Sequence, residues 1–383
     1  MSMGWKSKAI EAPVWLLSRF APTAKTLPEP VKSIFVLRSN DIGDLLVTTP
    51  LFEALRSRFP DARIAAGIGD WNREVLTNNP YVDEIFSINM PRYNKFTGPM
   101  RTKTVIKYLL SSPEVRAVAD RKFDIGIDIL GSYVGAALLI RAGIPYRLGV
   151  QGFIGGHSAS QQVVHYNSEE HVGRSALRFA ELLGGTGIPT YRPQLFLTPA
   201  EQDAGERRWN PRSANPVRRV VVGPGGGFAE KCWPVSSFRA LLELLTRHEP
   251  LEVIVVGGKQ DTEAGQLLAA AVPNTQNLAG QLSLRETFAL TAASDLVLCN
   301  SSMLMHVAGA FNKPNSVFLG EHFESASQHH AQWGYPDTCW VLGKGEDHSG
   351  VFTPQEGFER IRVATRNDPL AALAPQSVLD TVL

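Results

Sequence analysis

One acidic residue, Asp44, closes a polar loop that directly follows an apolar, strand-like run. The run spans residues 33–37, the loop spans 38–44, and an apolar helix-like segment comes next. Ligands of parallel α/β sheets bind at the carboxyl ends of strands, where a carboxylate can accept a proton from a bound hydroxyl. Aspartate is also a common helix N-cap. The pattern leaves both interpretations open, so Asp44 either acts on a ligand or only caps the following helix.

A second candidate site is a glycine cluster that follows the strand-like run at 220–222. Glycines after a strand let backbone N–H groups approach an anion closely, and a nearby lysine can neutralise a diphosphate. The alternative is a flexible turn between domains. The residues of this candidate anion site are Gly225, Gly226, Gly227 and Lys231.

A third candidate is the segment 90–107, which carries five basic side chains and no acidic one. Such a segment suits a ligand that bears phosphates or acidic groups. A solvated surface loop is the alternative. The basic residues are Arg92, Lys95, Arg101, Lys103 and Lys107.

Composition argues against several other functions. The 38 basic and 37 acidic residues leave a formal charge of +1, so no overall field favours nucleic acid. Three cysteines without CxxC spacing indicate no disulfide framework or structural zinc site and fit a reducing, cytoplasmic compartment. Neither glycine-containing loop has the dinucleotide fingerprint, and no Asp-x-Asp motif occurs. We therefore expect no cofactor and no metal.

These candidate sites need elements to position them, and the chain offers two runs of alternating strands and helices, typical of parallel α/β structure. A proline-rich stretch at 184–218 separates the two runs. In the first run we predict strands at 33–37, 63–68, 84–88, 124–130 and 147–150, with helices at 44–58, 72–78, 104–119, 133–142 and 169–183. In the second we predict strands at 220–222, 252–256, 276–279, 296–299 and 316–319, with helices beginning near 235, 262, 284 and 303.

The predicted architecture is an α/β protein with two Rossmann-like domains facing a central cleft, at 31–198 and 199–345. Residues 1–30 form an N-terminal extension that could be an amphipathic helix at the inner-membrane surface, or a helix packed on the body. The longest apolar run, 129–140, has 12 residues and is too short to span a bilayer. The tail, 346–383, contains helix-like stretches at 355–363 and 375–383, and we expect it to cross back to the first domain.

Several strings, taken together, resemble glycosyltransferase family 9, the ADP-heptose:lipopolysaccharide heptosyltransferases. The resemblance runs from Val31 to Gly320. It rests on Gly43-Asp44 with Arg56-x-x-Phe59-Pro60, on the glycine cluster with Lys231-x-Trp233-Pro234, and on the segments 255–263, 278–284 and 306–310. It implies a GT-B fold, a nucleotide-sugar donor carrying ADP, a lipopolysaccharide core or related anionic glycan acceptor, and inverting, metal-independent transfer at the cytoplasmic side of the inner membrane.

The same resemblance assigns roles to individual residues. Asp44 would be the catalytic base, and Lys231 would contact the donor phosphates. Arg92, Lys95, Arg101 and Lys103 would face an anionic acceptor. The remaining donor-binding candidates are Glu263 for the ribose, Leu282 for the adenine pocket, and Ser301, Ser302 and His306 at the start of a later helix.

One motif departs from the family pattern. Where the family has Asp-Thr-Gly, this chain has Ser301-Ser302-Met303, and the later Gly-Pro-Thr is replaced by Gly320-Glu321-His322. Two hydroxyls can still donate to phosphate at a helix N-terminus, although the carboxylate is lost. His306 could instead be a helix residue bonded internally. The departure leaves open a non-catalytic GT-B-like glycan or scaffold protein, and a nucleotide-sugar epimerase.

Overall fold

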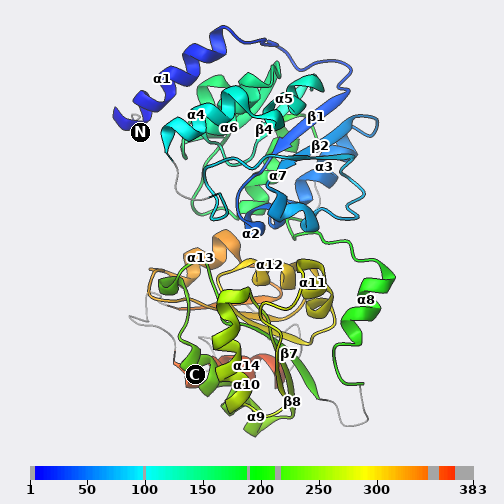
Figure 1. The fold of residues 1–383 in the computed structure, drawn as a ribbon, viewed down its shortest axis with the longest axis vertical. Coiled ribbons are helices and arrows are strands. Elements are labelled where there is room, and N and C mark those ends of the chain that lie inside the picture. The colour runs from blue at the N-terminus through cyan, green and yellow to red at the C-terminus, as the bar shows by residue number, and fades with distance from the viewer. Residues whose placement is uncertain (1–4, 98–100, 188–189, 212–216, 344–352, 367–383) are drawn as a thin grey trace. The chain divides into compact units, whose positions relative to one another are not determined.

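The chain divides into two compact units, Met1–Tyr191 and Arg192–Leu383, in a computed structural model. The structure describes residues 5–97, 101–187, 190–211, 217–343 and 353–366. Each unit is a parallel sheet with helices packed around it (Figure 1). The predicted α/β class with two Rossmann-like domains is confirmed.

The first unit contains a six-stranded sheet in the order β3-β2-β1-β4-β5-β6, and every pairing is parallel. The order reverses between β1 and β4, the position where ligands of doubly wound folds bind. Leu37, the last residue of β1, pairs with Gly67 and Asp128. The strands are β1 (Ser33–Leu37), β2 (Arg63–Ile68), β3 (Glu84–Ser87), β4 (Ile125–Asp128), β5 (Tyr146–Gln151) and β6 (Gln162–His165).

Helices of the first unit differ from prediction where proline or a capping residue starts a new helix. The predicted helix at 44–58 is two helices because Pro50 occupies the first turn of the second. The predicted helix at 104–119 is divided at Ser112, whose side chain caps the helix starting at Pro113. The helices are α1 (Trp5–Arg19), α2 (Ile42–Leu46), α3 (Pro50–Arg58), η1 (Asp70–Val75), α4 (Thr102–Ser111), α5 (Pro113–Asp120), α6 (Tyr133–Arg141), η2 (His157–Ala159) and α7 (Val172–Leu182).

The second unit repeats the topology with the order β12-β11-β10-β7-β8-β9. Trp233 stacks on Phe318 at 4.2 Å in its core. The strands are β7 (Arg218–Gly223), β8 (Leu251–Val255), β9 (Thr275–Asn277), β10 (Leu296–Asn300), β11 (Asn315–Phe318) and β12 (Cys339–Leu342). The helices are α8 (Pro199–Glu206), η3 (Ala229–Lys231), α9 (Val235–His248), η4 (Lys259–Asp261), α10 (Thr262–Ala271), α11 (Leu284–Ala292), α12 (Met303–Ala310), α13 (Ala326–Trp333) and α14 (Pro354–Arg366).

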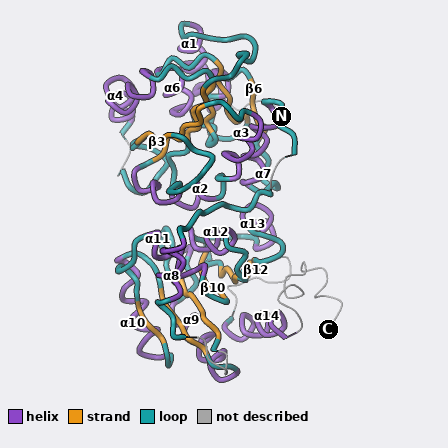
Figure 2. The backbone as a smooth tube through the Cα atoms, turned by 90° about the vertical axis from the view of Figure 1, so that its right-hand side faces the viewer, coloured by secondary structure: helices purple, strands orange, loops and turns teal. Residues whose placement is uncertain are grey.

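The described part of the tail forms the helix that was predicted at 355–363. Helix α14 packs on α9 within the second unit (Figures 1 and 2). The Phe358 and His248 rings are 5.7 Å apart. Ile361 of the helix belongs to the apolar core of the second unit, and Phe358 packs against that core. The return of the tail to the first domain stays a prediction. The helix predicted at 375–383 lies outside the described residues. None of the helices that the structure describes is long and apolar enough to cross a membrane.

Candidate active site

Asp44 lies in the first turn of a helix and does not occupy its N-cap position. Helix α2 begins at Ile42, so the N-cap position belongs to Asp41. The Asp44 carboxylate pairs with Arg38, whose Nη2 is 3.5 Å from Oδ1, and Arg38 Nε donates to the Asp44 carbonyl oxygen at 3.1 Å. The Asp44 side chain is 32% exposed and that of Arg38 is 6% exposed. The alternative that Asp44 is the N-cap is therefore wrong, and its carboxylate remains accessible at the carboxyl end of β1.

A second carboxyl group, that of Asp128, is close enough to Arg38 for their charges to interact. Burial lowers the pKa of Arg38, and the charges of Asp44 and Asp128 oppose this effect. Asp128 ends β4 and accepts from the Ser132 N–H at 2.8 Å. Burial raises the pKa of Asp128 to about 6, against the hydrogen bonds and the charge of Arg38. Arg38 and Asp128 were not among the predicted site residues, although both lie at a strand end.

The raised pKa of Asp128 predicts a pH-dependent stability difference for Asp128→Asn. The folded pKa of about 6 exceeds the ordinary 3.8, so folding favours the protonated form. This contribution is complete below about pH 4 and is lost as the pH rises through about 6. The melting temperature of the wild type should therefore fall relative to that of Asp128→Asn between pH 5 and pH 7, by roughly 2 °C or more. Thermal denaturation at the two pH values checks this, and an unchanged difference would contradict it.

The start of the basic segment is fastened to the loop that carries Asp44. Asn40 Nδ2 donates to the Tyr93 carbonyl at 2.9 Å, and the Lys95 N–H donates to Asp41 Oδ1 at 3.1 Å. Trp71 stacks on Phe96 at 4.7 Å and also donates to the Asn40 carbonyl at 2.8 Å. Residues 92–97 therefore lie beside the Asp44 loop in the same unit.

The four basic candidates do not all have the same surroundings. The Arg92 guanidinium lies against the rings of Tyr93 and Tyr133, at 5.1 and 5.2 Å from their centroids. Lys95 is exposed. Arg101 occupies the N-cap position of α4 and Lys103 its first turn, and both are exposed. The structure thus places Arg92 and Lys95 next to the Asp44 loop and the other two at the start of α4.

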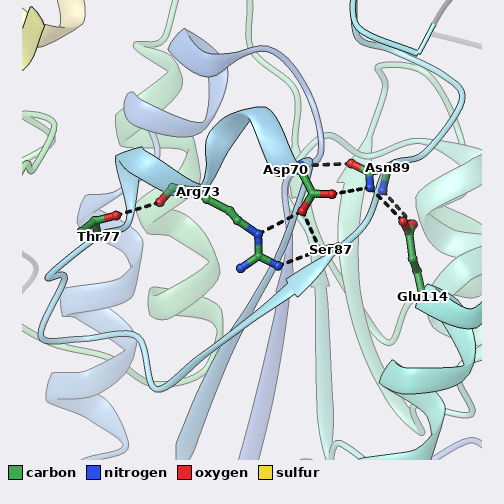
Figure 3. A network of polar contacts seen from close by, with 6 residues as sticks. All are labelled: Asp70, Arg73, Thr77, Ser87, Asn89 and Glu114. Atoms are coloured by element: carbon green, nitrogen blue, oxygen red, sulfur yellow. Dashed lines mark hydrogen bonds and ion pairs between the residues drawn. The ribbon is translucent and has the colours of Figure 1, made fainter. Parts of the chain in front are cut away.

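A network of hydrogen bonds joins the carboxyl ends of β2 and β3, just before the basic segment 90–107. The Asp70 carboxylate accepts from Arg73 at 3.0 Å, from Ser87 at 2.6 Å and from Asn89 at 2.7 Å (Figure 3). The hydrogen bonds from Ser87 and Asn89 lower the pKa of Asp70. Asn89 also donates to Glu114 of α5, at 2.9 Å from its side chain. The ends of β2 and β3 are therefore fixed to each other and to α5.

In the second unit, one buried residue fastens the glycine loop at both ends. Asn300 is fully buried at the end of β10. Its Nδ2 donates to the Pro224 carbonyl at 2.6 Å, and its Oδ1 accepts from the Trp233 N–H at 2.9 Å. The loop with Gly225, Gly226 and Gly227 lies between these two attachments. Sequence analysis missed Asn300 because its partners are far away in the sequence.

Lys231 ends the short helix η3 and lies between two aromatic rings. Its Nζ is 5.6 Å from the centroid of Phe228 and 5.4 Å from that of Phe323. Its backbone carbonyl accepts from the Gly320 N–H at 3.2 Å. A Cβ on Gly320 would come within 2.5 Å of the Glu230 carbonyl oxygen, so only glycine permits this close approach. The segment that follows β11 therefore supports the backbone that presents Lys231.

The acid that contacts the glycine loop is Asp261, two residues before the predicted ribose ligand Glu263. Asp261 Oδ2 accepts from the Gly258 N–H at 2.8 Å, and its Oδ1 is only 2.2 Å from where a Cβ on Gly225 would lie. Glu263 is exposed in the first turn of α10. Leu282 is half-buried just before α11. A donor role for Glu263 and Leu282 remains a prediction.

The hydroxyls at the start of α12 have different partners. The Ser302 side chain caps the helix by accepting from the Leu304 N–H at 3.4 Å. Ser301 Oγ instead lies 2.8 Å from His329 Nε2. The structure thus places Ser301 and Ser302 side by side at a helix N-terminus, with Ser302 engaged by the backbone.

His306 is directed into the second unit. It is 4% exposed, and its Nδ1 lies 2.7 Å from the hydroxyl of Tyr335. Its ring is also 5.9 Å from that of Trp333. These contacts correspond to the alternative of an internally bonded helix residue, and a donor role for His306 stays a prediction.

The chain is similar to known proteins of one family. Residues 115–324 match the model of glycosyltransferase family 9 (heptosyltransferase). Lipopolysaccharide heptosyltransferase 2 of Escherichia coli strain K12 is 26% identical over 302 residues, which cover 75% of this chain and 82% of the relative. Lipopolysaccharide heptosyltransferase 3 of the same strain is 25% identical over 285 residues, 73% of this chain and 79% of the relative.

Solved structures share the fold. The structure of E. coli ADP-heptose lps heptosyltransferase II aligns with a TM-score of 0.64 at 24% identity, covering 86% of this chain and 98% of that one. The glycosyl transferase family 9 structure from Veillonella parvula aligns with a TM-score of 0.66 at 18% identity, covering 91% and 95%. The resemblance found in the sequence is confirmed because the family model matches more than half of the chain. This chain belongs to glycosyltransferase family 9, the heptosyltransferases.

Proposed function

We propose that this chain transfers a heptose-like sugar from ADP-heptose to an anionic glycan acceptor of the lipopolysaccharide inner core. Family membership supports the donor and acceptor classes. The observation that carries the reaction is the partly exposed Asp44 carboxylate at the carboxyl end of β1, on a loop that is hydrogen-bonded to the segment containing Arg92 and Lys95. These groups are what a base and an anionic acceptor require.

The reaction we propose is a single displacement that inverts the anomeric centre. Asp44 takes the proton of an acceptor hydroxyl as the oxygen attacks the anomeric carbon. The bond from that carbon to the diphosphate oxygen breaks, and ADP leaves with the bonding electrons. Lys231 stabilises the negative charge that develops on the leaving diphosphate. No step requires a metal or another cofactor.

A transfer assay tests this function directly. ADP-heptose, a truncated lipopolysaccharide acceptor and the purified protein are incubated in EDTA, and the acceptor mass is followed by mass spectrometry. We expect the acceptor to gain one heptose. Conversion of the nucleotide sugar without acceptor would identify an epimerase instead. Absence of nucleotide-sugar binding would identify a non-catalytic glycan-binding or scaffold protein, as the Ser301-Ser302-Met303 departure allowed.

The exposed cations at the start of α4 should recognise the charge of the acceptor. The double substitution Arg101→Glu and Lys103→Glu should raise the acceptor KM about tenfold or more and leave ADP affinity unchanged, because it places like charges next to an anionic glycan. Steady-state kinetics with phosphorylated and dephosphorylated acceptors measure the effect. Reversing Arg207 and Arg247, exposed residues of the second unit, is the control with the same change of net charge. Equal KM values for both acceptors would refute this role.

Helix α1 is anchored to the first unit by one face. Glu11 Oε1 accepts from the Gly156 N–H at 2.6 Å and lies 2.8 Å from His157 Nδ1. Val14 is buried against Ala136 and Ala159. These contacts pack one face of the helix on the body of the first unit, as one of the two alternatives for this segment predicted.

The rest of the helix leaves large apolar side chains exposed, with Trp15 at 50% and Phe20, just beyond its end, at 85% exposure. Arg19 lies between them, over the Trp15 ring. We propose that this surface rests on an anionic bilayer, which matches its mixture of aromatic and basic groups. Leu16 and Leu17 are also exposed there.

The double substitution Trp15→Ser and Phe20→Ser should therefore weaken binding to vesicles containing phosphatidylglycerol about tenfold or more, since about 2 kcal/mol of burial is lost per large apolar side chain. Vesicle sedimentation measures the binding. Leu267→Ser is the control because Leu267 is a large apolar residue exposed to about the same extent as Trp15, at 56%, on α10 of the second unit. Retention of full vesicle binding by the double variant would exclude this surface.

A further inference from the structure

Ser301 and His329 form a polar cluster with Lys231 in the second unit. Ser301 Oγ is 2.8 Å from His329 Nε2, and His329 is only 6% exposed. The ring of Phe323 packs edge-on against His329 at 4.9 Å and lies 5.4 Å from Lys231 Nζ. A hydroxyl, an imidazole and an ammonium group are therefore gathered beside the glycine loop.

The surroundings of His329 determine its protonation. Burial, with the positive charge of Lys231, lowers its pKa to about 3, so the imidazole is neutral near pH 7 and carries one proton. Its Nδ1 is buried and has no hydrogen-bond partner among the described residues. A proton there would leave a buried N–H without an acceptor, which costs more than a buried lone pair. The proton therefore belongs on Nε2, and His329 donates to Ser301 Oγ.

This tautomer determines what Ser301 can do. Because Ser301 Oγ accepts from His329, its own proton is available to another acceptor. The hydroxyl precedes α12, whose N-terminus favours an anion, and the charge of Lys231 is close by. We propose that His329 is a positioning residue that orients the Ser301 hydroxyl as a hydrogen-bond donor to the diphosphate of the nucleotide. This inference rests on the proposed function, since it takes ADP as the ligand.

A double-mutant cycle measured by calorimetry with ADP tests the inference. Ser301→Ala and His329→Phe should each weaken ADP binding about tenfold, the amount typical of a hydrogen bond to a charged group. The double variant should bind ADP as Ser301→Ala does, because His329 acts only through Ser301. ADP affinity of wild-type strength in His329→Phe, or a further loss in the double variant, would overturn the proposal.

Conservative variants separate hydrogen bonding from packing. Glutamine can place an amide N–H near the position of Nε2, whereas asparagine reaches only the Nδ1 position. His329→Gln should therefore keep ADP affinity within about threefold of the wild type, and His329→Asn should lose about tenfold. The reverse order would overturn the proposal. These two variants also keep the test decisive if His329→Phe fails to fold.

Ser325→Ala is the structural control. Ser325 caps α13, the helix that carries His329, by accepting from the Gln328 N–H at 3.1 Å. This variant should lower the melting temperature and leave ADP affinity unchanged. If Ser325→Ala loses as much ADP affinity as His329→Phe, the effect of His329 comes from the packing of α13 and the proposal is overturned. Wild-type protein that binds ADP without transferring sugar would contradict the proposed function alone, and protein that binds no ADP would overturn both.

Discussion

Asp44→Asn is expected to reduce sugar transfer by about 10²-fold or more while the protein keeps its fold and its affinity for ADP. Asparagine has the size of aspartate but cannot take the proton of the acceptor hydroxyl. The substitution also removes the charge that pairs with Arg38 at 3.5 Å. Because the Asp44 side chain is 32% exposed and Arg38 still has Asp128 nearby, we expect a stability loss of about 1 kcal/mol only.

A matched control separates lost stability from lost chemistry. Asp83 is another arginine-paired aspartate of the first unit, with Oδ2 at 2.5 Å from Arg56 Nη2. It directly precedes β3 and therefore lies at the amino end of a strand, away from the carboxyl ends where Asp44 lies. Asp83→Asn should therefore lower the melting temperature by a similar amount without slowing transfer. Asp44→Asn enzyme that transfers sugar at the wild-type rate in EDTA would show that another group is the base.

The central strands of both sheets could be predicted from sequence because they are buried on both faces and appear as continuous apolar runs. The strands that were missed, β6 and β12, lie at sheet edges. β6 contains Gln162 and His165, so it has no apolar run to detect. Helix α8 was hidden for a different reason, because Pro199 at its first turn and the Thr198 capping box were interpreted as part of a proline-rich linker.

The candidate site was predictable where its residues are neighbours in the sequence. The glycine cluster with Lys231, and Gly43 with Asp44, are continuous strings. Asn300 and His329 were not predicted because their contacts join residues separated by 76 and 28 positions. Only the folded chain brings these residues together. Asp44 illustrates the limit of local reasoning. Helix α2 has its N-cap at Asp41, about one turn before Asp44, so Asp44 pairs with the side chain of Arg38 and does not cap the helix.

Lys231→Met should weaken ADP binding about 10- to 100-fold and lower kcat, because it removes a positive charge next to the diphosphate. Methionine keeps an unbranched apolar stem, so the contacts with Phe228 and Phe323 are largely retained. The loss should shrink at high salt, which already screens the interaction in the wild type. Calorimetry with ADP and single-turnover kinetics with ADP-heptose separate the effect on binding from the effect on the leaving group.

Lys313→Met supplies the control for this last prediction. It makes the same change of net charge in the same unit, but Lys313 precedes β11, at the opposite end of the strand from Gly320, which braces Lys231. A charge at that end of the sheet is too far from the glycine loop for strong attraction to a diphosphate at physiological ionic strength. ADP affinity and kcat should therefore stay at wild-type values in Lys313→Met. If Lys231→Met and Lys313→Met behave alike, the charge of Lys231 has no specific role, and the leaving diphosphate must be stabilised by the backbone N–H groups of the glycine loop.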